Sequence, residues 1–149
     1  MRRLGVLCLT ISAILVVVAL ALPASAGGRP LSAEMTGAQE VPGPGDPDGS
    51  GTVSFTMNPG RGEICFEVTS ENLTMPVIAA HIHPGQAGVA GAPLVFLLPA
   101  GTSDADGDFS GCATADRATV KDILQRPWAY YVNLHTTDFP AGAIRGQLG

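Results

Sequence analysis

Residues 63–69 read Glu-Ile-Cys-Phe-Glu-Val-Thr, so large apolar side chains stand at every second position. Because a β-strand turns successive side chains to opposite faces, this spacing predicts a strand with one buried face and one outward face. The buried set is Ile64, Phe66 and Val68, and the outward set is Glu63, Cys65 and Glu67.

Further runs of this kind follow one another along the chain, and Gly, Pro, Asp or Asn bound each of them. With 19 Gly and 12 Pro in 149 residues, the composition favours short strands and turns over long helices. We expect strands at 31–36, 51–57, 63–69, 77–83, 93–98, 108–113, 128–135 and 143–148.

One segment departs from the strand period. Val120, Ile123 and Leu124 recur at helical spacing, and Pro127 ends the pattern, which predicts a short helix at 117–125. The fold class is therefore all-β: an antiparallel immunoglobulin-like or Greek-key β-sandwich or barrel with one short helix near residues 117–125.

The first 26 residues have the features of a secretory signal peptide. Arg2 and Arg3 precede an almost wholly apolar stretch, residues 4–22, and Ala24-Ser25-Ala26 offers a cleavage site. An uncleaved membrane anchor is the alternative, because the apolar run approaches the length that spans a bilayer. We expect cleavage, which leaves one secreted, extracellular domain at 27–149 with no membrane partner.

The charge balance is acidic, with 8 Lys and Arg against 13 Asp and Glu. No run of basic residues follows the first few positions, so the electrostatic footprint of a nucleic-acid-binding protein is missing from the sequence. We therefore expect no nucleic-acid partner.

The three histidines, His81, His83 and His135, fall near the ends of two predicted strands. Alternation assigns them to the face away from the core, where an H-x-H pair places two imidazoles about 6.5–7 Å apart at the Cα atoms. If the two strands are neighbours, the third imidazole converges on the same point. Such a nitrogen-rich set suits copper, or zinc as the alternative, at a surface site with one open position.

The same alternation divides the other residues of these two strands. The expected core set is Ile78, Ala80, Ile82, Trp128, Tyr130, Val132 and Leu134, and the opposite set in the second strand is Tyr131, Asn133 and His135.

Two cysteines follow the leader, Cys65 and Cys112, and a secreted protein is expected to join them in a disulfide. A thiolate that joins the histidines at a copper site is the rival interpretation. Two acidic loops resemble calcium sites but are better explained as turns: residues Asp46, Asp48 and Ser50, and residues Asp104, Asp106, Asp108 and Ser110.

Four motifs in order resemble the CHRD domain, named for chordin, over nearly all of the chain after the leader. The motifs are Gly37-Ala38-Gln39-Glu40-Val41-Pro42, Ala80-His81-Ile82-His83 with the glycines that follow it, Tyr131-Val132-Asn133-Leu134-His135-Thr136, and Pro140-Ala141-Gly142-Ala143-Ile144-Arg145-Gly146-Gln147. Ala143 departs from the family, which usually has an acid there. The resemblance implies an extracellular β module.

The spacing of the histidines is also loosely similar to the copper ligands of copper-zinc superoxide dismutases. Those enzymes carry additional histidines for zinc, which this chain lacks.

These observations favour a secreted CHRD-domain protein that binds a copper ion through His81, His83 and His135. Around these ligands we expect residues that hold the imidazoles in place, mainly by hydrogen bonds. They are Glu40, Asn133, Gln39, Thr136, Asp138 and Arg145. Two alternatives stay open: a metal-free module that binds an extracellular protein or a polysaccharide, and a copper-dependent redox enzyme of the superoxide dismutase type. Because the acidic surface repels an anionic substrate, the enzyme is the least favoured.

Overall fold

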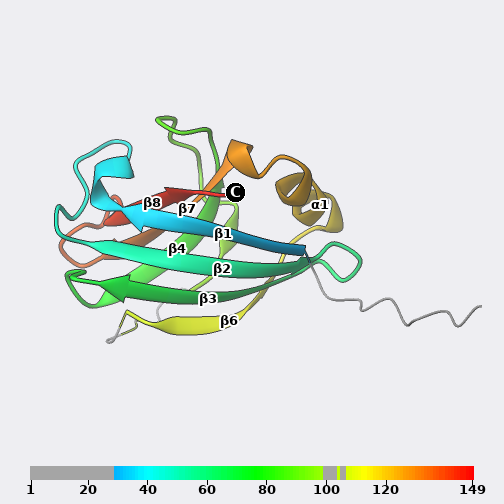
Figure 1. Ribbon diagram of the computed structural model, residues 1–149, viewed down its shortest axis with the longest axis horizontal. Helices are drawn as coiled ribbons and strands as arrows, with labels where there is room; N and C mark the ends of the chain where they lie inside the picture. The colour runs from blue at the N-terminus through cyan, green and yellow to red at the C-terminus, as the bar shows by residue number, and fades with distance from the viewer. Residues whose placement is uncertain (1–28, 99–103, 105–106) are drawn as a thin grey trace, which may run out of the picture.

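The computed structural model describes residues 29–98, 104 and 107–149, and the expected leader, residues 1–26, lies outside this range (Figure 1). The strands are β1 (Arg29–Thr36), β2 (Ser50–Asn58), β3 (Glu63–Glu71), β4 (Val77–Pro84), β5 (Val95–Phe96), β6 (Phe109–Thr114), β7 (Tyr130–Thr136) and β8 (Ile144–Gln147). The helices are α1 (Arg117–Gln125) and two short 3-10 turns, η1 (Gly37–Gln39) and η2 (Pro127–Ala129).

The strands form one antiparallel sheet in the order β5-β4-β7-β8-β1-β2-β3-β6. This sheet curls until its outer strands, β5 and β6, approach each other, so the fold is a nearly closed barrel (Figure 1). The all-β expectation is confirmed, and of its two forms the structure takes the barrel. None of the helices in the described ranges is long and apolar enough to cross a bilayer.

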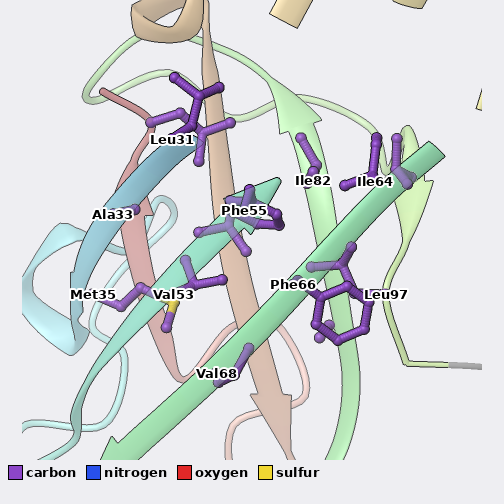
Figure 2. Close-up of a cluster of buried hydrophobic side chains, with 14 of the residues drawn as sticks. Leu31, Ala33, Met35, Val53, Phe55, Ile64, Phe66, Val68, Ile82 and Leu97 are labelled. Atoms are coloured by element: carbon purple, nitrogen blue, oxygen red, sulfur yellow. The ribbon is translucent and has the colours of Figure 1, made fainter. Parts of the chain in front are cut away.

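The core fills the inside of the barrel with the alternate residues of each strand. Figure 2 shows the buried side chains of β1, β2 and β3 gathered on one side of their strands. In the register of β2 and β3, Val53 pairs with Val68, and Phe55 pairs with Phe66. Together with Ile64, these side chains are at most 7% exposed, as alternation predicted. Burial of such side chains is the main term that stabilises the fold.

Helix α1 has the bounds that the sequence predicted and packs against β2 and β3 at one end of the barrel (Figure 1). Its apolar stripe, Val120, Ile123 and Leu124, is buried. The helix therefore adds its stripe to the core at that end of the barrel.

Two residues that were expected in the core, Ile78 and Trp128, are exposed instead. Ile78 is 36% exposed because the register between β4 and β7 shifts between Val77 and Ala79, and Val77 takes the buried place. Trp128 is 58% exposed because it belongs to the 3-10 turn η2 and not to a strand, so alternation does not apply to it. The strand expected at 93–98 is only Val95–Phe96.

The first strand connects the two halves of the sheet. β1 pairs along its whole length with β2, whereas its register with β8 is limited to Thr36 and Arg145. Beyond that pair, the backbone groups of Ser32 and Gly149 exchange two hydrogen bonds of 3.1 Å. The barrel therefore depends on contacts between the start and the end of the folded domain.

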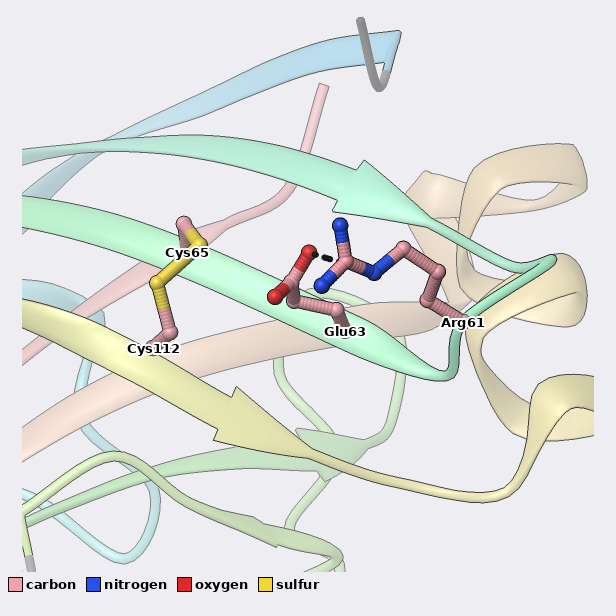
Figure 3. Close-up of a disulfide and its surroundings, with 4 residues drawn as sticks. All are labelled: Arg61, Glu63, Cys65 and Cys112. Atoms are coloured by element: carbon pink, nitrogen blue, oxygen red, sulfur yellow. Dashed lines mark ion pairs between the residues drawn. A yellow bond between two sulfur atoms is a disulfide. The ribbon is translucent and has the colours of Figure 1, made fainter. Parts of the chain in front are cut away.

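Cys65 and Cys112 form a disulfide between β3 and β6, where they are direct partners in the register (Figure 3). The expected disulfide is confirmed. The rival interpretation, a thiolate ligand beside the histidines, is wrong because both sulfur atoms are in this bond.

The acidic loops hold their carboxylates against backbone N–H groups. The Asp46 side chain accepts hydrogen bonds from the N–H groups of Thr74 and Asp48, and Asp108 accepts one from Ser70. Asp104 accepts one from Gly107, whereas Asp106 lies outside the described residues. The contacts of Asp48 and Gly107 are those of turns that a carboxylate stabilises, whereas those of Thr74 and Ser70 join segments far apart in the chain.

Candidate metal centre

The adjacent strands β4 and β7 bring the three histidines together. In their register His81 is opposite Asn133, His83 is opposite Tyr131, and Ala79 is opposite His135. Because side chains alternate along each strand and partners in register share a face, all of these residues lie on the face away from the core. The imidazoles thus share one face, as the sequence predicted.

The three imidazoles offer nitrogen atoms that all lie within 4.8 Å of one another. The closest pair is His81 Nδ1 and His135 Nε2, which are 3.2 Å apart. No other group of this kind occurs among the His, Cys, Asp and Glu side chains of the described residues.

Two backbone carbonyls determine which ring nitrogen carries the proton in His83 and in His135. His83 Nδ1 lies 2.9 Å from the carbonyl oxygen of Gly91, and His135 Nδ1 lies 3.1 Å from that of Pro140. Since a carbonyl oxygen only accepts, each Nδ1 must donate. In the neutral rings, the Nε2 atoms of His83 and His135 therefore carry free lone pairs, and both face the centre of the cluster.

Asn133 lies between these two lone pairs. Its Oδ1 is 2.8 Å from His83 Nε2 and 3.2 Å from His135 Nε2. The Glu40 carboxylate also interacts with this side chain, and the interaction lowers the Glu40 pKa. Because an ionised carboxylate only accepts, the amide nitrogen faces Glu40 and the amide oxygen faces the imidazoles.

Burial keeps the imidazoles neutral. Burial, together with smaller contributions from the charges of His135 and His83, lowers the pKa of His81 from 6.5 to about 4. Burial also lowers the pKa of His83 and of His135. Neutral imidazole is the form that binds a metal ion, so proton competition is weak near neutral pH.

Glu40 shows the opposite effect. Burial raises the pKa of this carboxyl from 4.5 to about 6, against hydrogen bonds from Asn133 and the Val41 backbone and the charge of Arg145. The side chain is 6% exposed and packs so closely on Gly142 that a Cβ there would lie 2.5 Å from the carboxylate. At neutral pH the carboxylate is ionised and can hold Asn133.

Tyr131 is a residue of the site that the sequence reasoning did not select. Its ring stacks on the His83 imidazole with centroids 4.7 Å apart and planes at 5°, and the Arg145 guanidinium lies 3.5 Å from its centroid. Arg145 Nη2 donates to the backbone oxygens of Gln86 and Val89. Alternation had placed Tyr131 beside Asn133, and this was the signal that could have identified it.

The segment 84–93 covers this face of the sheet, so the expectation of an open surface site is wrong. His81 is 9% exposed and His83 only 4%, whereas His135 is half-buried. Gly91, in that segment, contacts both His83 and the Tyr131 hydroxyl. Imidazoles on the outer face of the barrel are thus buried by a loop and not by the core.

The structure brings only part of the expected supporting set to the imidazoles. Asn133 contacts His83 and His135, Glu40 contacts Asn133, and Arg145 lies on Tyr131. The others have partners elsewhere: Gln39 bonds to Glu34 and Thr36, Thr136 at the end of β7 accepts from Phe139, and Asp138 is exposed beside Thr137.

The family model of the CHRD domain matches residues 31–148, nearly the whole described chain. The chain belongs to the CHRD family. CHRD domains are extracellular, and the disulfide of this member fits a compartment that permits oxidation. No curated protein and no solved structure matches the chain.

This CHRD domain departs from the family pattern at Ala143, which is fully buried. A carboxylate is nevertheless present beside this position, because Glu40 packs on the neighbouring Gly142. The acid near the site therefore comes from the segment after β1 in this chain.

Proposed function

We propose that this protein is an exported CHRD module that binds one copper ion through His81, His83 and His135. The observation that carries the proposal is the convergence of three imidazoles whose ring nitrogens lie within 4.8 Å of one another. Backbone carbonyls fix the tautomers of His83 and His135, so the lone pairs are aligned before an ion arrives. Such outer contacts orient ligands in known metal sites.

The spacing of the nitrogens supports a bound transition metal. At metal–nitrogen distances of about 2.0–2.1 Å, tetrahedral ligand atoms lie roughly 3.3 Å apart. The 3.2 Å between His81 Nδ1 and His135 Nε2 agrees with this spacing, and the widest pair, at up to 4.8 Å, must close when the ion binds. Imidazole suits copper and zinc, and copper binds such ligands more tightly.

The test is a titration of the metal-free purified protein with Cu(II) and with Zn(II), each against a competing chelator of known affinity. We expect one copper ion per chain, bound more tightly than zinc. His81→Ala should weaken copper binding at least tenfold. Gln39→Ala is the matched control because Gln39 is exposed and does not contact the imidazoles.

Copper uptake below one equivalent, or uptake that His81→Ala leaves unchanged, contradicts the proposal. Tighter zinc binding would keep the site and change its ion.

A second candidate is a metal-free module that binds an extracellular protein or a polysaccharide. It is favoured by one observation: His83 and His135 also hold loop carbonyls, those of Gly91 and Pro140. In this case the histidines only brace loops. Substitution of His81 would then lower the melting temperature equally with and without a chelator.

A further inference from the structure

We infer that the amide oxygen of Asn133 is the fourth donor of this centre, so that a bound copper ion has no vacant position. The inference rests on the proposed function and goes beyond it, since it states that the ion is held and is not offered to a substrate. Three features of Asn133 support it. They are the distances from Oδ1 to the imidazole nitrogens, the direction in which the amide points, and a contact with His83 that contains no proton when the ring is neutral.

The distances place Asn133 Oδ1 among the ligand atoms. The oxygen lies 2.8 Å from His83 Nε2 and 3.2 Å from His135 Nε2, as close to each as His81 Nδ1 is to His135 Nε2. These separations are those of atoms that share one ion of tetrahedral geometry, roughly 3.3 Å. Asn133 is 3% exposed and lies opposite His81 in the register, so the strands hold it there.

The orientation of the amide does not depend on an ion. The Glu40 carboxylate is buried and interacts with the Asn133 side chain, an interaction that lowers the Glu40 pKa. A reversed amide would set its oxygen against the Glu40 carboxylate, and two acceptors would then face each other. The oxygen is therefore directed at the cluster in advance.

The contact between His83 Nε2 and Asn133 Oδ1 contains no proton when the ring is neutral. His83 uses its one N–H group on the Gly91 carbonyl, so two lone pairs face each other at 2.8 Å. Buried acceptors without a donor are unfavourable. A cation between them satisfies both, which supports the oxygen as a ligand of the ion.

Three imidazoles and one amide oxygen make a four-coordinate set. Closed sets of four protein ligands are typical of sites that hold a metal ion, whereas catalytic sites keep one position for water or substrate. The inference therefore favours a binding protein over a redox enzyme.

The experiment adds azide to the Cu(II)-loaded protein and measures the azide-to-copper charge-transfer absorption. The wild type should show no band, because no position is vacant. Asn133→Ala should bind copper more weakly than the wild type, through the three imidazoles alone, and at saturating copper it should bind azide at least tenfold more tightly. Gln39→Ala should behave as the wild type.

A second measurement needs no variant. Relaxation of water protons by the Cu(II)-loaded wild type should show no exchanging water on the ion. Azide binding that is equal in wild type and Asn133→Ala, or a coordinated water in the wild type, overturns the inference while copper binding stands. Failure of the wild type to take up copper instead overturns the proposed function.

Discussion

Asn133 and Glu40 show how one carboxylate acts on a site that it does not touch. Glu40 lies behind the amide, and its hydrogen bond decides which end of Asn133 faces the imidazoles. Close packing on Gly142 leaves the carboxylate little room to move. The geometry of the centre thus depends on two residues outside the histidine pattern.

The imidazoles predict how the metal-free protein responds to pH. Their pKa values are lowered in the folded state, that of His81 from 6.5 to about 4, so the unfolded chain binds protons first as the pH falls. The free energy of unfolding should therefore decrease from about pH 6.5 toward pH 4.5. Glu40, with its pKa raised to about 6, opposes this change, but one carboxyl acts against three imidazoles.

Denaturant unfolding at pH 7, 6, 5 and 4.5 in the presence of a chelator measures this dependence. Asp46 and Asp122 have pKa values below 3.8 and do not contribute in this range. His81→Ala should flatten the curve. A free energy of unfolding that stays constant or increases as the pH falls from 6.5 to 4.5 would show that the imidazoles are not buried as neutral groups.

At the scale of single residues, the sequence predicted the face of the histidines but not their burial. Alternation applies to a strand and its two faces, and it places His81, Asn133 and Tyr131 correctly. It contains no information on a loop that returns over the outer face. In the segment 84–93, Gly91 contacts His83 and Tyr131, and Gln86 accepts from Arg145. Such contacts between a loop and a sheet leave no periodic pattern.

At the scale of elements, β3 and β6 are joined by a covalent bond in addition to their hydrogen bonds. The bond closes a loop of 47 positions. In the chain-entropy description, such a cross-link limits the unfolded chain and stabilises the fold by about 4 kcal/mol.

The double substitution Cys65→Ala and Cys112→Ala should accordingly lower the free energy of unfolding by about 4 kcal/mol. Denaturant unfolding measures it, with Ser110→Ala on the same exposed face of β6 as a control. Copper affinity should not change, because the two cysteines are bonded to each other and neither belongs to the histidine cluster. A loss below about 1 kcal/mol contradicts the cross-link argument.

Most elements were predictable from the sequence because each is bounded by turn residues and has a regular period. The helix of residues 117–125 is such a case, with Pro127 after it. The errors at Ile78 and Trp128 arise where the backbone leaves the strand period, at a register shift and in a 3-10 turn. The sequence around them contains no clear mark of either.

At the scale of the whole molecule, a copper ion that binds only the folded protein must raise its melting temperature. With free copper at 100 times the dissociation constant, the stabilisation is about 2.7 kcal/mol. A domain of about 120 residues gains roughly 4 °C per kcal/mol, so the melting temperature should rise by about 10 °C.

Differential scanning calorimetry with copper and with a chelator checks this prediction. The chelator should reverse the increase, and His81→Ala should show none. Equal melting temperatures under both conditions would instead support the metal-free module.

The position of β1 in the sheet has a consequence for biosynthesis. This strand opens the folded domain, yet its free edge receives Arg145 and Gly149 from a segment far along the chain. A growing chain can form the hairpin of β1 and β2 early, but one side of β1 stays unpaired until residues 144–149 have emerged. Emergence of that segment, and not of any single hairpin, therefore sets the earliest moment at which the barrel can close.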